Sequence, residues 1–197
     1  MGHEQLIALI VFALAGSFTP GPNNTIATAT GANHGLRAAV PHIFGVPFGL
    51  SSMLAVGAVG AAALIAAHPA LAAGIRWAGI AYLLAIAWSI ARTSAIGERA
   101  VARPLTFWQS AAFQYANPKA WMLAAATAGT YTAADEGLSQ IVVICAVFSS
   151  ACAASLVVWA AAGAALKEWL KRGARLRTFN ALMGALLAAT AVWMAFE

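Results

Sequence analysis

Two short segments of this sequence combine helix-breaking residues with polar side chains inside long apolar stretches. The first is the run TPGPNN, residues 19–24, and the second is the run NPK, residues 117–119. Because proline lacks an N–H and glycine tolerates non-helical backbone, each run is expected to interrupt a helix. Backbone groups released there, together with the asparagine amides, suit the polar ends of a small molecule. The candidate substrate-binding residues are therefore Thr19, Pro20, Gly21, Pro22, Asn23, Asn24, Asn117, Pro118 and Lys119.

The first run is expected to place polar groups at the start of a resumed helix. Pro20 and Pro22 cannot donate to the carbonyls of Gly16 and Phe18, which are predicted to lose their helical donors. In a bilayer such groups are tolerated only where the backbone is buried in protein or lines a wet cavity. The N-terminal end of the resumed helix carries positive partial charge, which suits a carboxylate. The alternative is an ordinary proline kink, and the presence of two matched breaks argues against it.

The second run carries a lysine in the middle of an uncharged window, residues 104–134. Asn117 and Pro118 are predicted to cap and begin a helix, which leaves the carbonyl of Gln114 free. Lys119 is then expected near the bilayer centre, where a charge costs about 3 kcal/mol or more. No Asp or Glu lies in a predicted span, so Lys119 is either neutral or paired with a substrate carboxylate. The alternative for Lys119 is snorkelling of its long side chain to an interface.

His42 and two glycine pairs supply further candidates. His42 is expected near one end of the second span and is a candidate for carrying a coupling proton, with a hydrogen-bonded helix-end histidine as the alternative. The glycines at 31 and 35 and at 45 and 49 are four residues apart and allow a neighbouring helix to approach closely. For Gly45 and Gly49, that approach is expected either inside the helical bundle or in a homodimer.

The composition requires a membrane environment for these residues. Of 197 residues, 62% are apolar and 9% are charged, and the mean hydropathy is +0.80, which is far from the values of soluble domains. Apolar runs without alternating polarity predict an all-α integral membrane protein rather than a β-barrel. The six predicted spans are residues 5–32, 39–67, 71–92, 105–133, 138–166 and 178–196.

The basic residues sort by loop. The formal net charge is +5, yet nine of the 11 Lys and Arg residues follow the first, third and fifth predicted spans. This pattern predicts membrane topology rather than nucleic-acid binding, and the positive-inside rule places those loops in the cytoplasm. A multi-pass protein of the cytoplasmic membrane with both termini outside is expected.

The chain is predicted to be a single transporter domain, residues 1–197, made of two repeats. Pro20 and Pro118 are 98 residues apart, and each lies in the first span of a three-span half. Because three is odd, a second copy of such a unit inserts in the opposite orientation, which is the inverted-repeat architecture of many secondary transporters. The repeats are expected over residues 1–96 and 97–197, with broken helices at spans 1 and 4.

Four segments carry a resemblance to a known family. The runs TPGPNN, HGLRAA, RWAGIAYLLAIAW at 76–88 and NPKA at 117–120 resemble, in order and spacing, the LysE/RhtB family of amino-acid exporters. The resemblance implies a cytoplasmic-membrane exporter of amino acids or their derivatives that uses the proton motive force. The run TFWQSAAFQYANPKAW at 106–121 is similar to the branch that exports cysteine and O-acetylserine. The run WMLAAATAGTYTAADEG that follows departs from the family, because it lacks an aromatic-rich segment ending in Pro-Gln-Phe.

These observations predict a secondary-active exporter that alternates access around a mid-membrane site, with the substrate carboxylate docked on Lys119. The expected partners are a small amino-acid-like substrate, the lipid bilayer and a second copy of the chain; neither a cofactor nor a metal is expected. A passive channel or facilitator is the first alternative. An intramembrane enzyme is the second, and the spans contain no cluster of nucleophile and base or of metal ligands that would support it.

Overall fold

The computed structural model describes residues 1–58, 68–93, 103–131, 138–172 and 174–196, and all regular structure in these ranges is helical. Long runs of Ala, Leu, Val and Ile have neither the alternation nor the turn signals of strands, so helices satisfy the backbone within each segment. The helices are α1 His3–Phe18, α2 Pro22–His34, α3 Leu36–Ala58, α5 Pro69–Ala91, α6 Phe107–Tyr115, α7 Pro118–Tyr131, α8 Leu138–Leu170 and α9 Arg175–Phe196.

Four of the described helices contain a segment long and apolar enough to cross a bilayer: α3, α5, α8 and α9. A fifth span results if α1 and α2, which meet at an angle of 55°, are counted as one broken span. The expected fourth span is divided into the shorter helices α6 and α7. The expected ends of two spans, within residues 59–67 and 132–133, and the expected repeat boundary near residue 96 lie outside the described residues.

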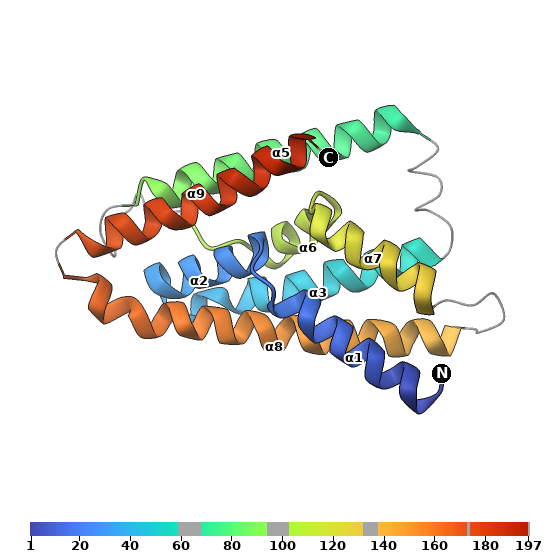
Figure 1. Cartoon of the computed structure of the whole chain (residues 1–197). Coiled ribbons are helices and arrows are strands. Elements are labelled where there is room, and N and C mark those ends of the chain that lie inside the picture. The colour runs from blue at the N-terminus through green and yellow to red at the C-terminus, as the bar shows by residue number, and fades with distance from the viewer. Residues whose placement is uncertain (59–67, 94–102, 132–137, 173, 197) are drawn as a thin grey trace.

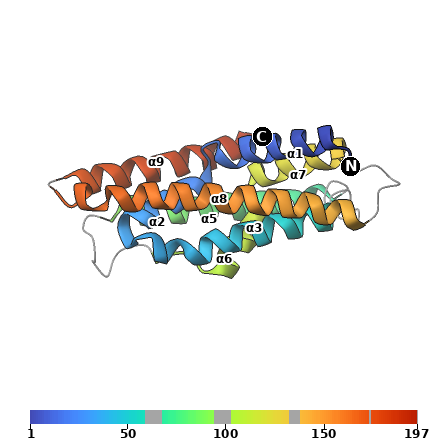
Figure 2. The same ribbon diagram turned by 90° about the horizontal axis from the view of Figure 1, so that it is seen from below.

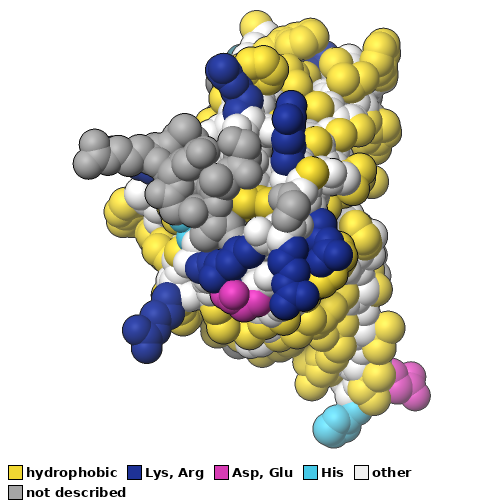
Figure 3. Space-filling view, turned by 90° about the vertical axis from the view of Figure 1, so that its left-hand side faces the viewer, with side chains coloured by type: hydrophobic (Ala, Val, Ile, Leu, Met, Phe, Trp, Pro, Cys, Tyr) yellow, Lys and Arg dark blue, Asp and Glu magenta, His cyan; other side chains and the backbone are white. Residues whose placement is uncertain are grey.

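The helices run along one long axis of the molecule, with α5 beside α9 and with α2 and α3 beside α8 (Figures 1 and 2). We call one end the basic end: there α2, α5 and α8 finish and α3 and α9 begin, at the left of Figure 1. Seen from that side, lysine and arginine side chains gather on the surface (Figure 3). Helix α1 begins at the opposite end.

Large apolar side chains cover the outer surface of the helices. Phe44, Trp88, Val142 and Leu182 are each more than half exposed. In a water-soluble bundle such residues would be buried, whereas in a bilayer they contact lipid. The surface therefore agrees with the composition in requiring a membrane.

Glycines allow the broken helices to pack closely on other helices. Gly31 of α2 lies against the backbone of Ala160 in α8, and Gly163 of α8 lies against the backbone of Thr28 in α2, so that no β-carbon would fit at either glycine. The pair Gly45 and Gly49 of α3 faces α6 in the same way. Of the two alternatives for the second glycine pair, close packing inside the bundle is therefore confirmed.

Candidate functional site

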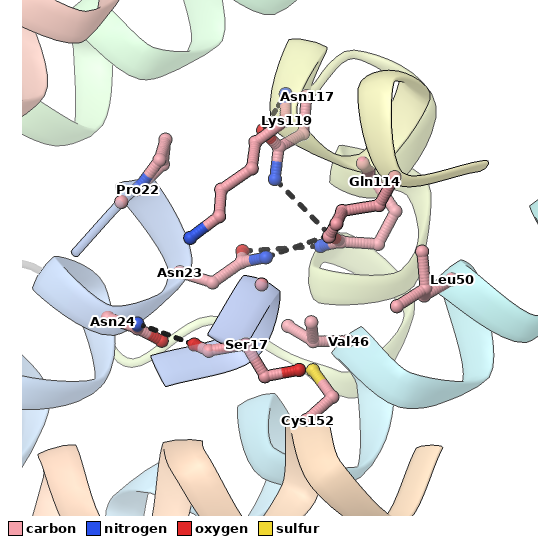
Figure 4. A pocket seen from close by; sticks show the side chains of 14 residues that line it. Ser17, Pro22, Asn23, Asn24, Val46, Leu50, Gln114, Asn117, Lys119 and Cys152 are labelled. Atoms are coloured by element: carbon pink, nitrogen blue, oxygen red, sulfur yellow. Dashed lines mark hydrogen bonds between the residues drawn. The ribbon is translucent and has the colours of Figure 1, made fainter. Parts of the chain in front are cut away.

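The two helix breaks meet at one cavity (Figure 4). The first break lies between α1 and α2, and the second lies between α6 and α7. The space open to the centres of water molecules is about 40 Å³, enough for a few waters. The cavity is lined by Gly16, Ser17, Gly21, Pro22, Asn23, Asn24, Val46, Leu50, Gln114, Asn117, Lys119, Ala120, Leu123 and Cys152.

Six of the nine candidate binding residues line this break cavity: Gly21, Pro22, Asn23, Asn24, Asn117 and Lys119. Thr19, Pro20 and Pro118 lie in the breaks but are not part of the lining. Thr19 still takes part, because its carbonyl accepts a hydrogen bond from Lys119. The structure therefore brings both predicted runs together, although they are separated by almost half of the chain.

Asn24 holds the first break together. Its Nδ2 donates to the carbonyls of Ser17 at 2.9 Å and of Thr19 at 3.0 Å. A second donor, the hydroxyl of Ser155 in α8, reaches the Ser17 carbonyl at 2.9 Å. Since buried carbonyls without donors are costly in a bilayer, these three bonds stabilise the unwound segment. Both amide hydrogens of Asn24 are used in this way, which gives its amide nitrogen a structural role.

The second break differs in one respect from the sequence-based expectation. Asn117 caps α7 as predicted, since its Oδ1 accepts the N–H of Lys119 at 3.1 Å. The prediction that the Gln114 carbonyl is free is wrong, because that carbonyl accepts the Asn117 N–H at 3.1 Å in a tight turn. The carbonyl of Tyr115 accepts instead from the indole nitrogen of Trp121, at 2.7 Å.

A pair of amide side chains joins the two breaks. Asn23 Nδ2 donates to Gln114 Oε1 at 2.8 Å, and Gln114 Nε2 donates back to Asn23 Oδ1 at 3.3 Å. Gln114 Nε2 also donates to the Ser110 carbonyl at 2.8 Å, which fixes the amide on α6. Sequence reasoning missed Gln114. The sequence signal that could have identified it is its position about one helical turn before Asn117, since residues at that spacing lie on the same face of a helix.

Lys119 extends from the second break to the first (Figure 4). Its Nζ donates to the Thr19 carbonyl at 2.5 Å. A β-carbon at Gly21 would lie 3.2 Å from Lys119 Cδ, so the glycine makes room for the lysine side chain. Among the described residues the carboxyl side chains are Glu4, in the first turn of α1, and Glu168, which pairs with Lys171 at the basic end. Lys119 makes no ion pair with either.

His42 lies near the start of α3, as expected for one end of the second span, and next to the break cavity. It is in the second turn of α3 and is 1% exposed. Its Nε2 lies 3.1 Å from the carbonyl of Asn23, and its Nδ1 lies 2.9 Å from the hydroxyl of Ser110. Because a carbonyl only accepts, Nε2 carries a hydrogen, and Nδ1 of the neutral ring accepts from Ser110. His42 thus contacts the break cavity through Asn23.

The sequence of this chain is similar to those of known proteins over most of its length. Residues 14–197 match the family described as the LysE type translocator. The chain belongs to the LysE family. Cysteine/O-acetylserine efflux proteins of Escherichia coli K12 and of E. coli O9:H4 are each 28% identical to it over 193 residues, which is 98% of this chain and 98% of theirs. The protein of the same name from Salmonella typhimurium LT2 is 28% identical over 95% of both chains. No solved structure matches.

Family membership confirms the resemblance seen in the sequence and makes the protein a membrane translocator rather than an enzyme. The similar proteins reported above are named for efflux. The long apolar helices of this chain are of the length that crosses a membrane, as a translocator requires. The break cavity of this LysE-family chain brings together polar groups from both helix breaks.

Proposed function

We propose that this LysE-family protein is a secondary-active exporter of small amino acids or their derivatives, and that the substrate binds in the break cavity. The observation that carries the proposal is the position of Lys119. This basic residue lies at the second helix break and contacts a carbonyl, but it contacts no carboxylate of the described residues. An ammonium group has three donors, and one is used by Thr19. The remaining two suit a substrate carboxylate. Cysteine and O-acetylserine are the first candidates, because relatives across the whole chain are named for their efflux.

The substrate carboxylate would give the lysine the counter-ion that the described chain does not provide. A hydrogen bond to a charged group contributes about 1.5–3 kcal/mol. Asn23 and Gln114, which bond to each other across the two breaks, are placed to exchange that bond for one to the substrate.

The proposal includes two inverted three-helix repeats. The buried positions of α3 at 46, 50, 53 and 54 correspond to the buried or pocket-facing positions of α8 at 144, 148, 151 and 152, always 98 residues later. The hydroxyl oxygens of Ser51 and Ser149, also 98 residues apart, lie 2.6 Å from each other. A residue contacts its own equivalent only on a symmetry axis. These features support a two-fold axis between α3 and α8. On this proposal α6 and α7 together form one membrane crossing, the fourth along the chain, which brings the total to six.

Orientation follows from charge within the same proposal. The basic end faces the cytoplasm by the positive-inside rule, and both termini then face outward. A homodimer remains a prediction. Its interface would use surfaces other than Gly45 and Gly49, because α6 covers those glycines. Alternating access would expose the break cavity first to the basic end and then to the opposite end.

Replacing Lys119 tests the proposal. Cells that overproduce the protein should release amino acids into the medium, and profiling that medium identifies the substrate. The Lys119→Ala variant should insert normally in the membrane but lose export by at least about ten-fold, because it lacks one charged hydrogen bond. Lys171→Ala is the control, since that lysine is exposed at the basic end. Normal export by Lys119→Ala would remove this lysine from the mechanism.

Flux measurements separate a carrier from a passive facilitator. Vesicles preloaded with unlabelled substrate should show saturable uptake and counterflow of labelled substrate. Flux that rises linearly with concentration and shows no counterflow would overturn the carrier mechanism and favour the facilitator.

A further inference from the structure

A second cavity lies between the break cavity and the basic end. It is bounded by α2, α5 and the segment that leads into α6, and about 220 Å³ is open to the centres of water molecules. Its apolar wall includes Ile26, Ile86 and Leu105, and its polar groups include Thr30, Ser89 and Arg103. This space is larger than the break cavity and mixes apolar with polar lining, as small-molecule sites do.

Helix α2 connects the two cavities. Residues 21–24 line the break cavity, whereas residues 26–34 contribute to the second one. At 1.5 Å per helical residue, Asn23 and Thr30 are separated by roughly 10 Å along the axis. Because α2 ends at the basic end, a molecule that enters from that end meets the second cavity before it meets Lys119.

Asn33 and Thr93, which line the second cavity, belong to a satisfied hydrogen-bond cluster. Asn33 and Asn180 donate to each other's Oδ1, at 2.8 and 3.0 Å. Asn33 Nδ2 also donates to the Ala29 carbonyl, and Asn180 Nδ2 donates to the Thr93 carbonyl. All four amide hydrogens are therefore used to hold α2, α9 and the end of α5 together. The cluster therefore holds the wall of the cavity in place and leaves no amide hydrogen for a ligand.

Arg103 is the charged group with spare hydrogen-bonding capacity in this cavity. It is exposed, lines the space, and makes no hydrogen bond or ion pair with another described residue. A guanidinium group offers five donors in a planar fork, which binds a carboxylate through two parallel hydrogen bonds. The hydroxyls of Thr30 and Ser89 can accept from an ammonium group, and the apolar wall suits a short side chain.

We infer that this second cavity is a waiting site for the transported zwitterion, in which Arg103 holds the substrate carboxylate before it passes to Lys119. The inference rests on the proposed export function and adds a second binding step to it. It assigns Arg103 to capture from the basic end and Lys119 to the transport step itself. The two residues should therefore affect different kinetic constants.

Transport into inside-out vesicles tests the assignment, with radiolabelled cysteine as the probe under reducing conditions. Arg103→Gln should raise the apparent KM at the face of the basic end about ten-fold, as expected for the loss of one charged hydrogen bond, while the maximal rate stays within about two-fold. Ser89→Leu, which fills the cavity but keeps Arg103, should raise KM as well. Arg177→Gln is the matched control, because it removes the same charge from an exposed site of α9 outside the cavity.

Equilibrium binding of the same probe to purified protein in nanodiscs separates the inference from the proposed function. Lys119→Ala should retain binding that the added change Arg103→Gln abolishes. An unchanged KM in both Arg103→Gln and Ser89→Leu, in a protein that exports cysteine, would overturn the waiting site and leave the export function standing. Absence of both binding and transport of cysteine in the unmodified protein would overturn the waiting site for this substrate, and absence of amino-acid export altogether would overturn the proposed function.

Discussion

Lys119 and Gln114 lie on either side of the second helix break, and each reaches a group of the first break. Lys119 bonds to the Thr19 carbonyl, and Gln114 bonds to the side chain of Asn23. One residue brings charge and the other brings a neutral amide. Among the described residues that line the cavity, Lys119 is the single lysine or arginine, and side-chain amides lie around it. On the proposed function, this is the environment that receives one carboxylate.

Gln114→Glu should inhibit transport by supplying that carboxylate from the protein. The new side chain has almost the same shape, but its charge would compete with the substrate for Lys119. We expect KM to rise by about ten-fold or more at neutral pH, the size of one charged hydrogen bond. Transport should recover as pH falls, because protonated glutamate is neutral like glutamine. Initial rates in vesicles at several pH values measure both effects.

Gln109→Glu is the control for that experiment. It makes the same change on the same helix at an exposed position, where the side chain closes a capping box with Thr106. Glutamate is equally suited to that role, so transport should be unaffected. Equal inhibition by the two variants would contradict the idea of an internal counter-ion.

His42→Gln tests the predicted coupling role. A glutamine amide can donate to the Asn23 carbonyl as the imidazole does, so the protein should fold. It cannot titrate near neutral pH. We expect exchange of substrate without a gradient to continue, while acceleration by an imposed pH gradient is lost. His68→Gln, at the start of α5, is the control. A full response to the gradient in His42→Gln would remove His42 from coupling.

At the scale of elements, glycines decide how closely the helices approach. Gly163 faces the backbone of Thr28, and a β-carbon there would overlap a carbonyl that cannot rotate away. Gly74 of α5, by contrast, has open space around it. The two glycines therefore form a matched pair for mutation.

Gly163→Ala should destabilise the protein by about 1–3 kcal/mol, the usual range for overpacking. Gly74→Ala should be neutral or stabilising by about 0.5–1 kcal/mol, because alanine is the better helix former. Thermal unfolding of the detergent-solubilised variants measures the difference. A melting temperature for Gly163→Ala equal to that of the unmodified protein would show that α2 and α8 can separate without loss of stability.

The helix breaks were predictable because their cause is local. Proline removes a donor wherever it occurs, but Pro41 and Pro47 lie inside α3 without ending it. The ends of α1 and α6 therefore follow from Pro20, Pro22 and Pro118 together with the neighbouring glycine and asparagines. The matching positions of the two breaks, 98 residues apart in the two halves of the chain, suggested that the breaks face each other. Cys152 of α8 and Val46 of α3 also line the cavity, but neither carries any local signal. Their place depends on how whole helices pack, which a single sequence does not encode in short motifs.

Hydrogen-bond partners were the least predictable part of the site. The sequence indicated that the carbonyls of Gly16 and Phe18 would lose helical donors. It did not indicate that Asn24 and Ser155 would donate to the neighbouring carbonyls of Ser17 and Thr19. His42 was expected near one end of the second span, and it lies in the second turn of α3. Its true environment depends on Asn23 and Ser110, which come from two other helices.

At the scale of the whole molecule, the contact between Ser51 and Ser149 offers a test of the proposed symmetry. In a background without Cys145 and Cys152, cysteines at both serine positions should form an intramolecular disulfide on mild oxidation, because the two hydroxyl oxygens are 2.6 Å apart. Pairing Ser51→Cys with Ser150→Cys should not, since Ser150 is exposed and bonds to its own helix. Gel mobility before and after reduction distinguishes the two.

Function after cross-linking carries the second half of this prediction. A bond on the axis between two rocking halves moves little, so the cross-linked protein should retain transport. Complete loss of transport, restored by reduction, would show that α3 and α8 separate during the cycle and would place the pivot elsewhere.

The close packing of α2 on α8 and of α6 on α3 also bears on how such a chain could have arisen. Each broken helix finds its glycine-bearing partner in the other half of the sequence. A polypeptide of residues 1–96 alone would leave the Gly31 surface of α2 and the Gly45–Gly49 surface of α3 bare. On the inverted-repeat proposal, an ancestor of half this length would have covered both surfaces only by pairing with an oppositely inserted copy of itself. Gene fusion would then have made permanent an antiparallel partnership that already existed.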